Sequence, residues 1–151
     1  MGVLARAVGR LAKLWWRIAQ PLTVGVRLIL LKDGAVMLVK HTYGRHWYLP
    51  GGGVKKGESL EQAARREAAE ELGATLGPLR LFGVYSNFFE RKSDHVVVFA
   101  CDEFTLAGPR DREIERAEFF RLKALPDDVS PGTHRRLDEF RQGAPPAAGA
   151  W

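Results

Sequence analysis

Three glutamates, Glu67, Glu70 and Glu71, have a spacing that could support chemistry. If this stretch is helical, spacings of three and four residues place their carboxylates on nearly one face, where they repel one another. Hard divalent cations prefer carboxylate oxygens, so Mg²⁺ or Mn²⁺ would offset that repulsion. The triplet by itself also fits a solvated helix face, because Arg66 can pair with Glu70 one turn along the helix.

The segment that leads into this helix favours a ligand site. Residues 49–53 read Leu-Pro-Gly-Gly-Gly and bring backbone without side chains up to the carboxylates. Glycine permits unusual backbone angles and close contact with a ligand, so backbone carbonyls or amides could join the site. Read without the helix, the glycines alone also fit a tight turn.

Together these residues resemble the Nudix box, written G-x5-E-x7-R-E-U-x-E-E-x-G-U, in which U is an apolar residue. Its fixed positions are matched by Gly52, Glu58, Arg66, Glu67, Glu70, Glu71 and Gly73. At average residue usage, seven such identities coincide by chance about once in 10⁸ starting points. The match is therefore far more specific than a lone glycine-rich loop. The apolar positions hold Ala68 and Ala74, which are smaller than the residues often found there and favour closer helix packing.

The resemblance implies a fold and a reaction. The Nudix fold is of the α/β (α+β) class, an α/β/α sandwich with a mixed sheet between helices, and its box forms a loop, a helix and a loop that bind metal. In such enzymes water attacks one phosphorus of a nucleoside diphosphate linked to another group, and divalent ions offset the charge that develops. The implied cofactor is Mg²⁺ or Mn²⁺.

The resemblance also assigns metal ligands. Glu70 and Glu71 would bind the ion, and Glu67 would be a ligand that also acts as general base for the attacking water. The backbone carbonyl of Gly51 is a further candidate ligand.

Other residues would support these ligands. Arg66 would orient Glu67, Glu58 would hold the metal site or its loop, and Gly52 is the box glycine. Some family members take the base from a later loop, where Glu113 is our preferred candidate because Glu113-Ile114 precedes an expected strand. The other acidic candidates outside the box are Glu90, Asp94, Glu115 and Glu118.

The remainder of a substrate could be bound by cations that pair with phosphate and by rings that stack on a base. The candidates of these types are Arg27, His41, Tyr43, Arg45, His46 and Trp47. Markers of the NADH and coenzyme A subfamilies are absent, and residues 79–89 contain no proline where ADP-ribose enzymes place one. A nucleoside triphosphate, ordinary or oxidised, is therefore the first expectation by elimination.

A binding module is the alternative to an enzyme. Such a module would use the same fold to bind a nucleotide or RNA without turning it over, and a damaged box would be its usual mark. Here Glu67, Glu70 and Glu71 are all retained. We therefore expect a small nucleotide-type substrate and no stable nucleic-acid partner.

Local signals predict the elements around the box. Apolar runs at 23–32 and 35–41 flank Asp33-Gly34, a strong hairpin signal. Ser59 begins a helix through residue 72, with Gln62 completing a capping box and Gly73 ending it.

The rest of the chain predicts further strands and a last helix. A strand pair is expected at 79–87 and 94–105, and a shorter strand at 117–122. Ser130-Pro131 opens a helix that directs Leu137 and Phe140 inward. The stretch at 143–151 is rich in Ala, Pro and Gly, which predicts a disordered tail.

The N-terminal segment has a helical pattern of its own. Its apolar positions are Leu4, Val8, Leu11, Trp15 and Ile18, and its basic stripe is Arg6, Arg10, Lys13 and Arg17. The sequence thus divides into an amphipathic basic helix at 1–20, a Nudix domain at 21–142 and the tail. The helix could pack on its own domain or on a second subunit as a homodimer, dock through residues 3–19 on an anionic membrane, or serve as a targeting presequence.

Composition bounds the remaining expectations. With 151 residues and 46% hydrophobic residues, the chain suits one globular domain and one active site. A net charge of +5 favours anionic partners without choosing among them. The single cysteine, Cys101, provides neither a disulfide framework nor a thiolate metal cage, which fits a reducing cytoplasmic location. No apolar run reaches the roughly 20 residues of a membrane span, so we expect a soluble or membrane-peripheral protein.

Overall fold

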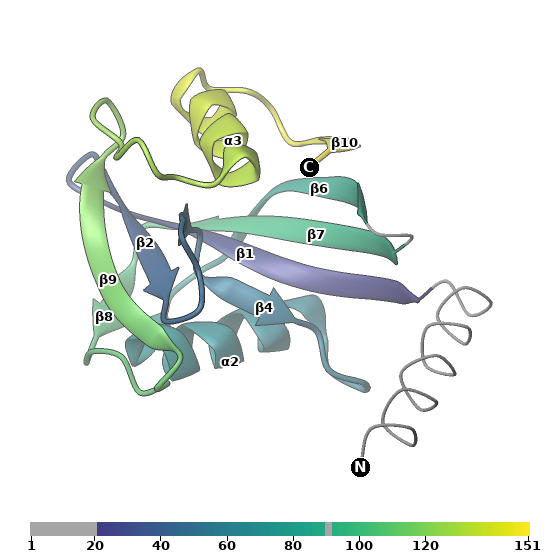
Figure 1. Ribbon diagram of the computed structural model, residues 1–151, viewed down its shortest axis with the longest axis horizontal. Helices are drawn as coiled ribbons and strands as arrows, with labels where there is room; N and C mark the ends of the chain where they lie inside the picture. Colours follow the sequence, from purple (N-terminus) through teal and green to yellow (C-terminus); the bar gives the residue numbers. More distant parts are fainter. Residues whose placement is uncertain (1–20, 90–91) are drawn as a thin grey trace, which may run out of the picture.

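A computed structural model describes residues 21–89 and 92–151 of the chain (Figure 1). The amphipathic helix expected over residues 3–19 lies outside the described residues, and so does Glu90. Within the two described ranges, no helix combines the length and the hydropathy needed to cross a membrane.

A mixed sheet forms the centre of the described fold. Its main path runs in the order β10-β6-β7-β1-β2-β3, while β4 pairs with β1 and β9 pairs with β2. The strands of this sheet are β1 (Leu22–Lys32), β2 (Ala35–His41), β3 (Trp47–Tyr48), β4 (Gly51–Gly53), β6 (Arg80–Phe89), β7 (Lys92–Cys101), β9 (Ile114–Arg121) and β10 (Ala147–Ala150). Because β1 is parallel to β7 and antiparallel to β2 and β4, the prediction of a mixed sheet is confirmed.

Two helices lie on opposite sides of this sheet, α2 (Leu60–Leu72) and α3 (Pro131–Arg141) (Figure 1). Alternation along β1 explains the two layers, since successive strand residues point to opposite faces. Val26 and Leu28 belong to the core cluster that includes α2 residues, whereas Ile29 belongs to the cluster that includes Leu137 of α3. The predicted α/β/α sandwich is therefore confirmed.

The first hairpin and α2 form as their local signals predict. Asp33 and Gly34 both have positive φ, 51° and 75°, which matches the twist of a two-residue hairpin turn. The Ser59 side chain accepts a hydrogen bond from the Gln62 backbone N–H at 3.1 Å, and the Ser59 N–H donates to the Gln62 side chain at 2.8 Å. Gly73 then ends the helix in the left-handed conformation.

The second half of the chain differs from expectation in its strand boundaries. The strand expected at 94–105 is two elements, because β7 ends at Cys101 and β8 (Phe104–Leu106) leaves the main sheet to pair with β5 (Ala74–Leu76). Exposed residues 102–103 separate the two strands. The sequence did not predict this break, because apolar residues lie on both sides of it. The last helix does begin after Ser130, and Leu137 is buried as expected.

The C-terminal tail is ordered, contrary to the expected disorder. Residues 147–150 form β10, which pairs in parallel with β6. The Arg136 guanidinium lies 3.9 Å from the centroid of the Tyr85 ring and donates a 2.7 Å hydrogen bond to the Ala150 carbonyl. Trp151 packs edge-on against Tyr85. A sheet edge, a buried cation and one aromatic ring thus order a segment whose composition alone predicts disorder.

Candidate active site

A cleft of about 360 Å³ gathers the box residues. It lies where β4, α2, the end of β2 and the loop before β9 meet, and it is lined by backbone from Gly51 and Gly52. Five carboxyl groups line it, those of Glu67, Glu70, Glu71, Asp111 and Glu113. Three cationic side chains face them, Arg27, Lys55 and Arg66. The excess of acidic groups gives the cleft the charge expected of a cation site.

Gly51 and Gly52 let the loop approach both β1 and α2. Gly51 adopts φ +141°, and a Cβ there would lie 2.0 Å from the Val26 carbonyl oxygen. A Cβ on Gly52 would lie 2.6 Å from the Glu67 carboxylate carbon. The absence of side chains therefore allows β4 to pair with β1 while the Glu67 carboxylate lies against its backbone.

We predict that Gly52→Ala lowers activity while leaving most of the stability. The added methyl would meet the end of a side chain, so Glu67 would turn away from its observed position. The matched control is Gly53→Ala, since no heavy atom of another part of the described chain lies within 4 Å of a Cβ at that position. Steady-state kinetics and thermal melting of both variants test this. Equal activity in the two variants would show that the position of Glu67 does not depend on Gly52.

Arg66 binds the acidic residues together. Its Nε donates to Glu58 Oε1 at 2.7 Å, its Nη1 to Glu67 Oε1 at 2.7 Å, and the same Nη1 to Glu70 Oε2 at 3.2 Å. Nη2 reaches the Gly53 carbonyl at 2.9 Å. One guanidinium thus connects the loop with two of the three box carboxylates on α2.

Glu58 is the main partner of Arg66 in this network. Hydrogen bonds from the Arg66 guanidinium, and from the Lys55 backbone N–H, lower the pKa of Glu58 to about 2. The same contact with Glu58 raises the pKa of Arg66. Both groups are therefore charged at neutral pH, and the pair fixes the direction in which Arg66 presents its Nη1 to Glu67.

Glu71 lies deeper than the other box carboxylates. Its residue exposure is 4%, and its Oε2 accepts a 2.8 Å hydrogen bond from the Gly51 N–H. Burial raises its pKa to about 7, although the Gly51 hydrogen bond and Arg27 act in the opposite direction. In the absence of a cation, a substantial fraction of this group is protonated near neutral pH.

We predict that Glu71→Gln stabilises the metal-free protein at high pH. Because folding raises this pKa from 4.5 to about 7, the stability of wild type falls as pH rises through that window, and the loss is complete above it. Glutamine cannot ionise, so the variant should be more stable by roughly 1–3 kcal/mol at pH 8 and similar at pH 5.

Urea unfolding with a chelator present tests this prediction at both pH values. Glu70→Gln is the matched control, since Glu70 lies next to Glu71 on the same helix and its side chain is 48% exposed. An unchanged or lower stability of Glu71→Gln at pH 8 would contradict the expected penalty of burying this charge.

Carboxylate oxygens are the ligands that a hard divalent cation prefers, but in this structure the box carboxylates are hydrogen-bonded to other groups of the protein. Within residues 21–89 and 92–151, no three acidic, histidine or cysteine side chains are gathered closely enough to hold an ion as they stand. Arg66 occupies oxygens of Glu67 and Glu70, and the Gly51 N–H occupies one of Glu71. Each carboxylate has a second oxygen, and rotation of Glu70 away from Arg66 would free one more, so Mg²⁺ or Mn²⁺ could be held while Arg66 keeps its contact with Glu67.

The Gly51 carbonyl, a candidate ligand, is also engaged. Arg27 Nη1 donates to it at 2.8 Å and to the Leu49 carbonyl at 3.2 Å. A carbonyl oxygen has a second lone pair, so this contact leaves one acceptor position. Arg27, expected to bind substrate, thus also holds the glycine loop in place.

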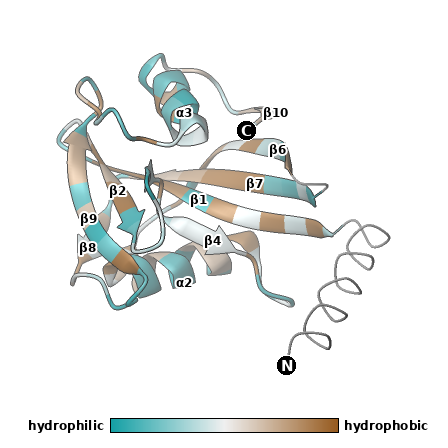
Figure 2. Cartoon of the chain, in the orientation of Figure 1, coloured by the Kyte–Doolittle hydropathy of each residue, from teal (hydrophilic) through white to brown (hydrophobic). Residues whose placement is uncertain are grey.

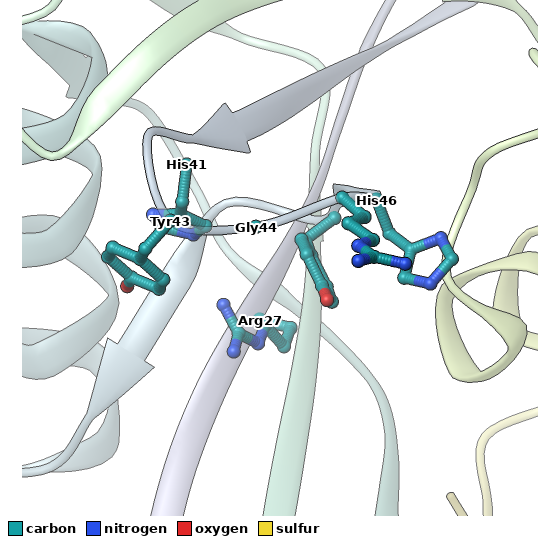
Figure 3. Close-up of a pocket in the computed structure, with 7 residues that line it drawn as sticks. Arg27, His41, Tyr43, Gly44 and His46 are labelled. Carbon is teal, nitrogen blue, oxygen red and sulfur yellow. The ribbon is translucent and has the colours of Figure 1, made fainter.

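A second hollow of about 380 Å³ adjoins the acidic cleft (Figure 3). It shares Arg27, His41 and Tyr43 with that cleft and adds Gly44, Arg45, His46 and Tyr48. Figure 3 shows Arg27 facing the segment that carries Tyr43 and His46. The structure therefore brings together five of the six residues that the sequence suggests for substrate, next to the box.

Rings line one end of this hollow. His41 and Tyr43 stack with centroids 5.2 Å apart and planes 19° apart. Burial, and then the charge of Arg27, lower the pKa of His41, so this imidazole is neutral at neutral pH. Its Nδ1 is buried and has no hydrogen-bond partner among residues 21–89 and 92–151. Trp47, the sixth candidate, is instead buried in the core against Phe120.

The loop before β9 supplies one acidic residue that sequence analysis missed. The backbone N–H of Asp111 donates to the Glu70 carbonyl at 2.9 Å, which holds the loop against α2 and places Asp111 in the cleft beside Glu113. The sequence signal that could have identified Asp111 is its position two residues before Glu113, which was a candidate. Asp94, Glu115 and Glu118 are not part of the cleft lining.

Comparisons with known proteins place the chain in one family. The profile of the NUDIX domain matches residues 20–140. An ADP-ribose pyrophosphatase of Methanocaldococcus jannaschii is 35% identical over 108 residues, 68% of this chain and 64% of the relative. A Bacillus subtilis protein provisionally named an 8-oxo-dGTP diphosphatase is 31% identical over 123 residues, 81% of this chain and 82% of the relative.

Solved structures show the same fold. A MutT NUDIX hydrolase from Burkholderia pseudomallei superposes with a TM-score of 0.70 at 29% identity, covering 78% of this chain and 96% of the other. A MutT protein from Methanosarcina mazei gives 0.69 at 22% identity, over 82% and 95%.

The sandwich and its acidic cleft thus define a Nudix domain. The chain belongs to the Nudix hydrolase family, and the expectations of that family and its fold are confirmed.

Proposed function

We propose that the chain is a pyrophosphohydrolase that requires Mg²⁺ or Mn²⁺ and cleaves a phosphoanhydride bond of a nucleoside triphosphate. The observation that carries the proposal is the acidic cleft, in which five carboxyl groups lie beside glycine backbone. The cleft adjoins a hollow that is lined by cations and rings. The relatives named as pyrophosphatase and diphosphatase support the type of reaction.

Glu67, Glu70 and Glu71 are the proposed metal ligands, together with the Gly51 carbonyl. They are oxygen donors in one cleft, and the excess of acidic groups there favours a divalent cation. When bound, the ion offsets negative charge that develops on the phosphate oxygens. Asp111 and Glu113 are further proposed acidic groups because they line the same cleft from the loop.

Glu67 is also the proposed general base for the attacking water. The Arg66 contact at 2.7 Å fixes the carboxylate, and Glu58 fixes Arg66 in turn, so Arg66 and Glu58 act as positioning residues. A carboxylate held in one orientation can accept the proton of a water molecule that approaches phosphorus. Gly52 leaves the space that this carboxylate occupies.

The hollow beside the cleft is the proposed site for the rest of the substrate. Arg27 and Arg45 are suited to phosphate oxygens, and Tyr43 offers a ring on which a base can stack. His46 is the second basic ring of the hollow, and its Nδ1 lies 3.1 Å from the Asp128 carbonyl, which orients it. These contacts favour a substrate with phosphates next to an aromatic base.

ADP-ribose is the second candidate substrate. The Methanocaldococcus jannaschii relative favours it through its name, while the absence of proline from residues 79–89 argues against it. In favour of a triphosphate stand the Bacillus subtilis relative and a nucleoside triphosphatase NudI of Escherichia coli, which is 45% identical over 53 residues, 32% of this chain.

A substrate panel tests both candidates. Product release from ordinary and oxidised nucleoside triphosphates, ADP-ribose, dinucleoside polyphosphates and nucleotide sugars would be measured with Mg²⁺ and with Mn²⁺. The proposal expects the highest kcat/KM for a triphosphate, and a preference for ADP-ribose would replace it with the second candidate. Tight nucleotide or RNA binding without any turnover would instead identify a binding module.

A further inference from the structure

Four apolar side chains at one end of the sheet are exposed. Leu22, Val24, Val84 and Phe88, here called the apolar strip, have exposed fractions between 36% and 74%. They come from β1 and β6, which lie on either side of β7. Isolated exposed apolar residues are ordinary, but neighbouring ones on one sheet face indicate a surface that something covers.

The strand register places the strip on the side of the sheet that α2 covers. Leu22 pairs with Ser93 and so does Phe88, and directly paired residues point to the same face. Val84 pairs with Val97, which belongs to the core cluster that includes α2 residues. Leu22, Val24 and Val26 are alternate residues of β1 and so point to the same face, and Val26 is also in that cluster.

The α2 helix does not reach this end. Val26 and Leu28 are fully buried on that face, whereas Leu22 and Val24, earlier in the same strand, are exposed. Figure 1 shows the starting end of β1 extending beyond α2, and Figure 2 shows hydrophobic bands along this end of β1, beside a hydrophilic start of β7 that carries Ser93. The strip is therefore a continuation of the core face without a covering element among the described residues.

The chain enters the described fold at this strip. The Ser93 N–H donates to the Pro21 carbonyl at 3.2 Å, so Pro21, to which residues 1–20 are joined, lies beside the strip. Their sequence carries apolar residues on one helical face, Leu4, Val8, Leu11, Trp15 and Ile18. A helix over residues 3–19 would be roughly 25 Å long. The three strands β6, β7 and β1 span only about 10 Å between outer axes, so the helix is long enough to cross them.

We propose that residues 3–19 pack as a helix on the apolar strip of the same chain. Direct covalent continuity at Pro21 gives this segment a high effective concentration at the strip, roughly millimolar for a short linker. A second copy or a membrane would have to displace it. Packing through Leu11 and Trp15 would leave the basic stripe that contains Arg10 in solvent.

Hydrogen exchange measured by mass spectrometry on the full chain tests the docking, at a concentration where light scattering shows a monomer. Backbone amides in residues 3–19 should be protected in wild type. Leu22→Ser and Phe88→Ser should each speed their exchange by about tenfold or more, because each removes apolar contact. Leu106→Ser is the matched control, since Leu106 is 39% exposed on β8, and it should leave this exchange unchanged.

A second pair of variants keeps the test valid if a strip variant unfolds. Leu11→Ser should speed exchange of the same amides, whereas Arg10→Gln on the basic stripe should not. Three results would overturn the proposal. They are absence of protection in the wild-type monomer, protection only at concentrations that give a dimer, and protection only with vesicles of anionic lipid.

Discussion

Replacement of Glu67 by glutamine is expected to lower kcat by roughly 10²- to 10⁴-fold, the range that a general base contributes. Glutamine keeps the size of the side chain but removes the charge that pairs with Arg66 at 2.7 Å and that would accept a proton. The Glu67 side chain is only 14% exposed and pairs with Arg66, so the melting temperature of the variant is measured beside its kinetics. Steady-state kinetics with saturating metal measure the effect.

Glu61→Gln is the matched control for this variant. Glu61 is an exposed acidic residue in the first turn of the same helix, outside the cleft lining. The control should retain wild-type kcat and melting temperature. A Glu67→Gln enzyme as active as this control would rule out both proposed roles of Glu67.

Gly51→Ala is expected to destabilise the fold by about 3 kcal/mol or more. The new Cβ would meet the Val26 carbonyl oxygen at 2.0 Å and the Val26 carbonyl carbon at 2.9 Å, which are backbone atoms of a central strand. The φ of +141° is itself unfavourable for a residue with a side chain. Relief of the contact requires β4 to leave β1, and the Gly51 N–H would then lose Glu71.

Gly34→Ala separates the two causes of this effect. Gly34 also has positive φ, +75°, but among the described residues nothing outside its own turn lies within 4 Å of a Cβ there. The control therefore measures backbone strain alone, roughly 1 kcal/mol. Urea unfolding of both variants gives the comparison. If Gly51→Ala loses no more stability than Gly34→Ala, the close approach of β4 to β1 is not rigid.

The elements that the sequence predicts well are those with local chemical signals. The Ser59 and Gln62 side chains cap α2 by bonding to backbone within three residues, so their meaning does not depend on the rest of the fold. The Asp33-Gly34 turn is equally local. The placement of Glu67 and Glu71 in one cleft follows from helix periodicity once α2 exists.

The features that escaped prediction depend on contacts distant in sequence. Asp111 enters the cleft because its loop bonds to the Glu70 carbonyl, a contact that no spacing of residues reveals. The tail is ordered by β6 and by Arg136, whose buried guanidinium lies over the Tyr85 ring and donates to the Ala150 carbonyl. Arg27 likewise contacts residues distant in sequence, because it bonds to the Gly51 carbonyl and lines both the acidic cleft and the adjoining hollow.

The most direct test of the metal site is a Mn²⁺ titration of wild type and Glu70→Gln, followed by electron paramagnetic resonance and by turnover in the same samples. The proposed site predicts that wild type binds Mn²⁺, that turnover rises with the bound ion, and that a chelator abolishes both. Glu70→Gln should bind Mn²⁺ roughly 10- to 100-fold more weakly. Turnover that survives the chelator, or equal Mn²⁺ affinity in the two proteins, would contradict the assignment of the α2 carboxylates as metal ligands.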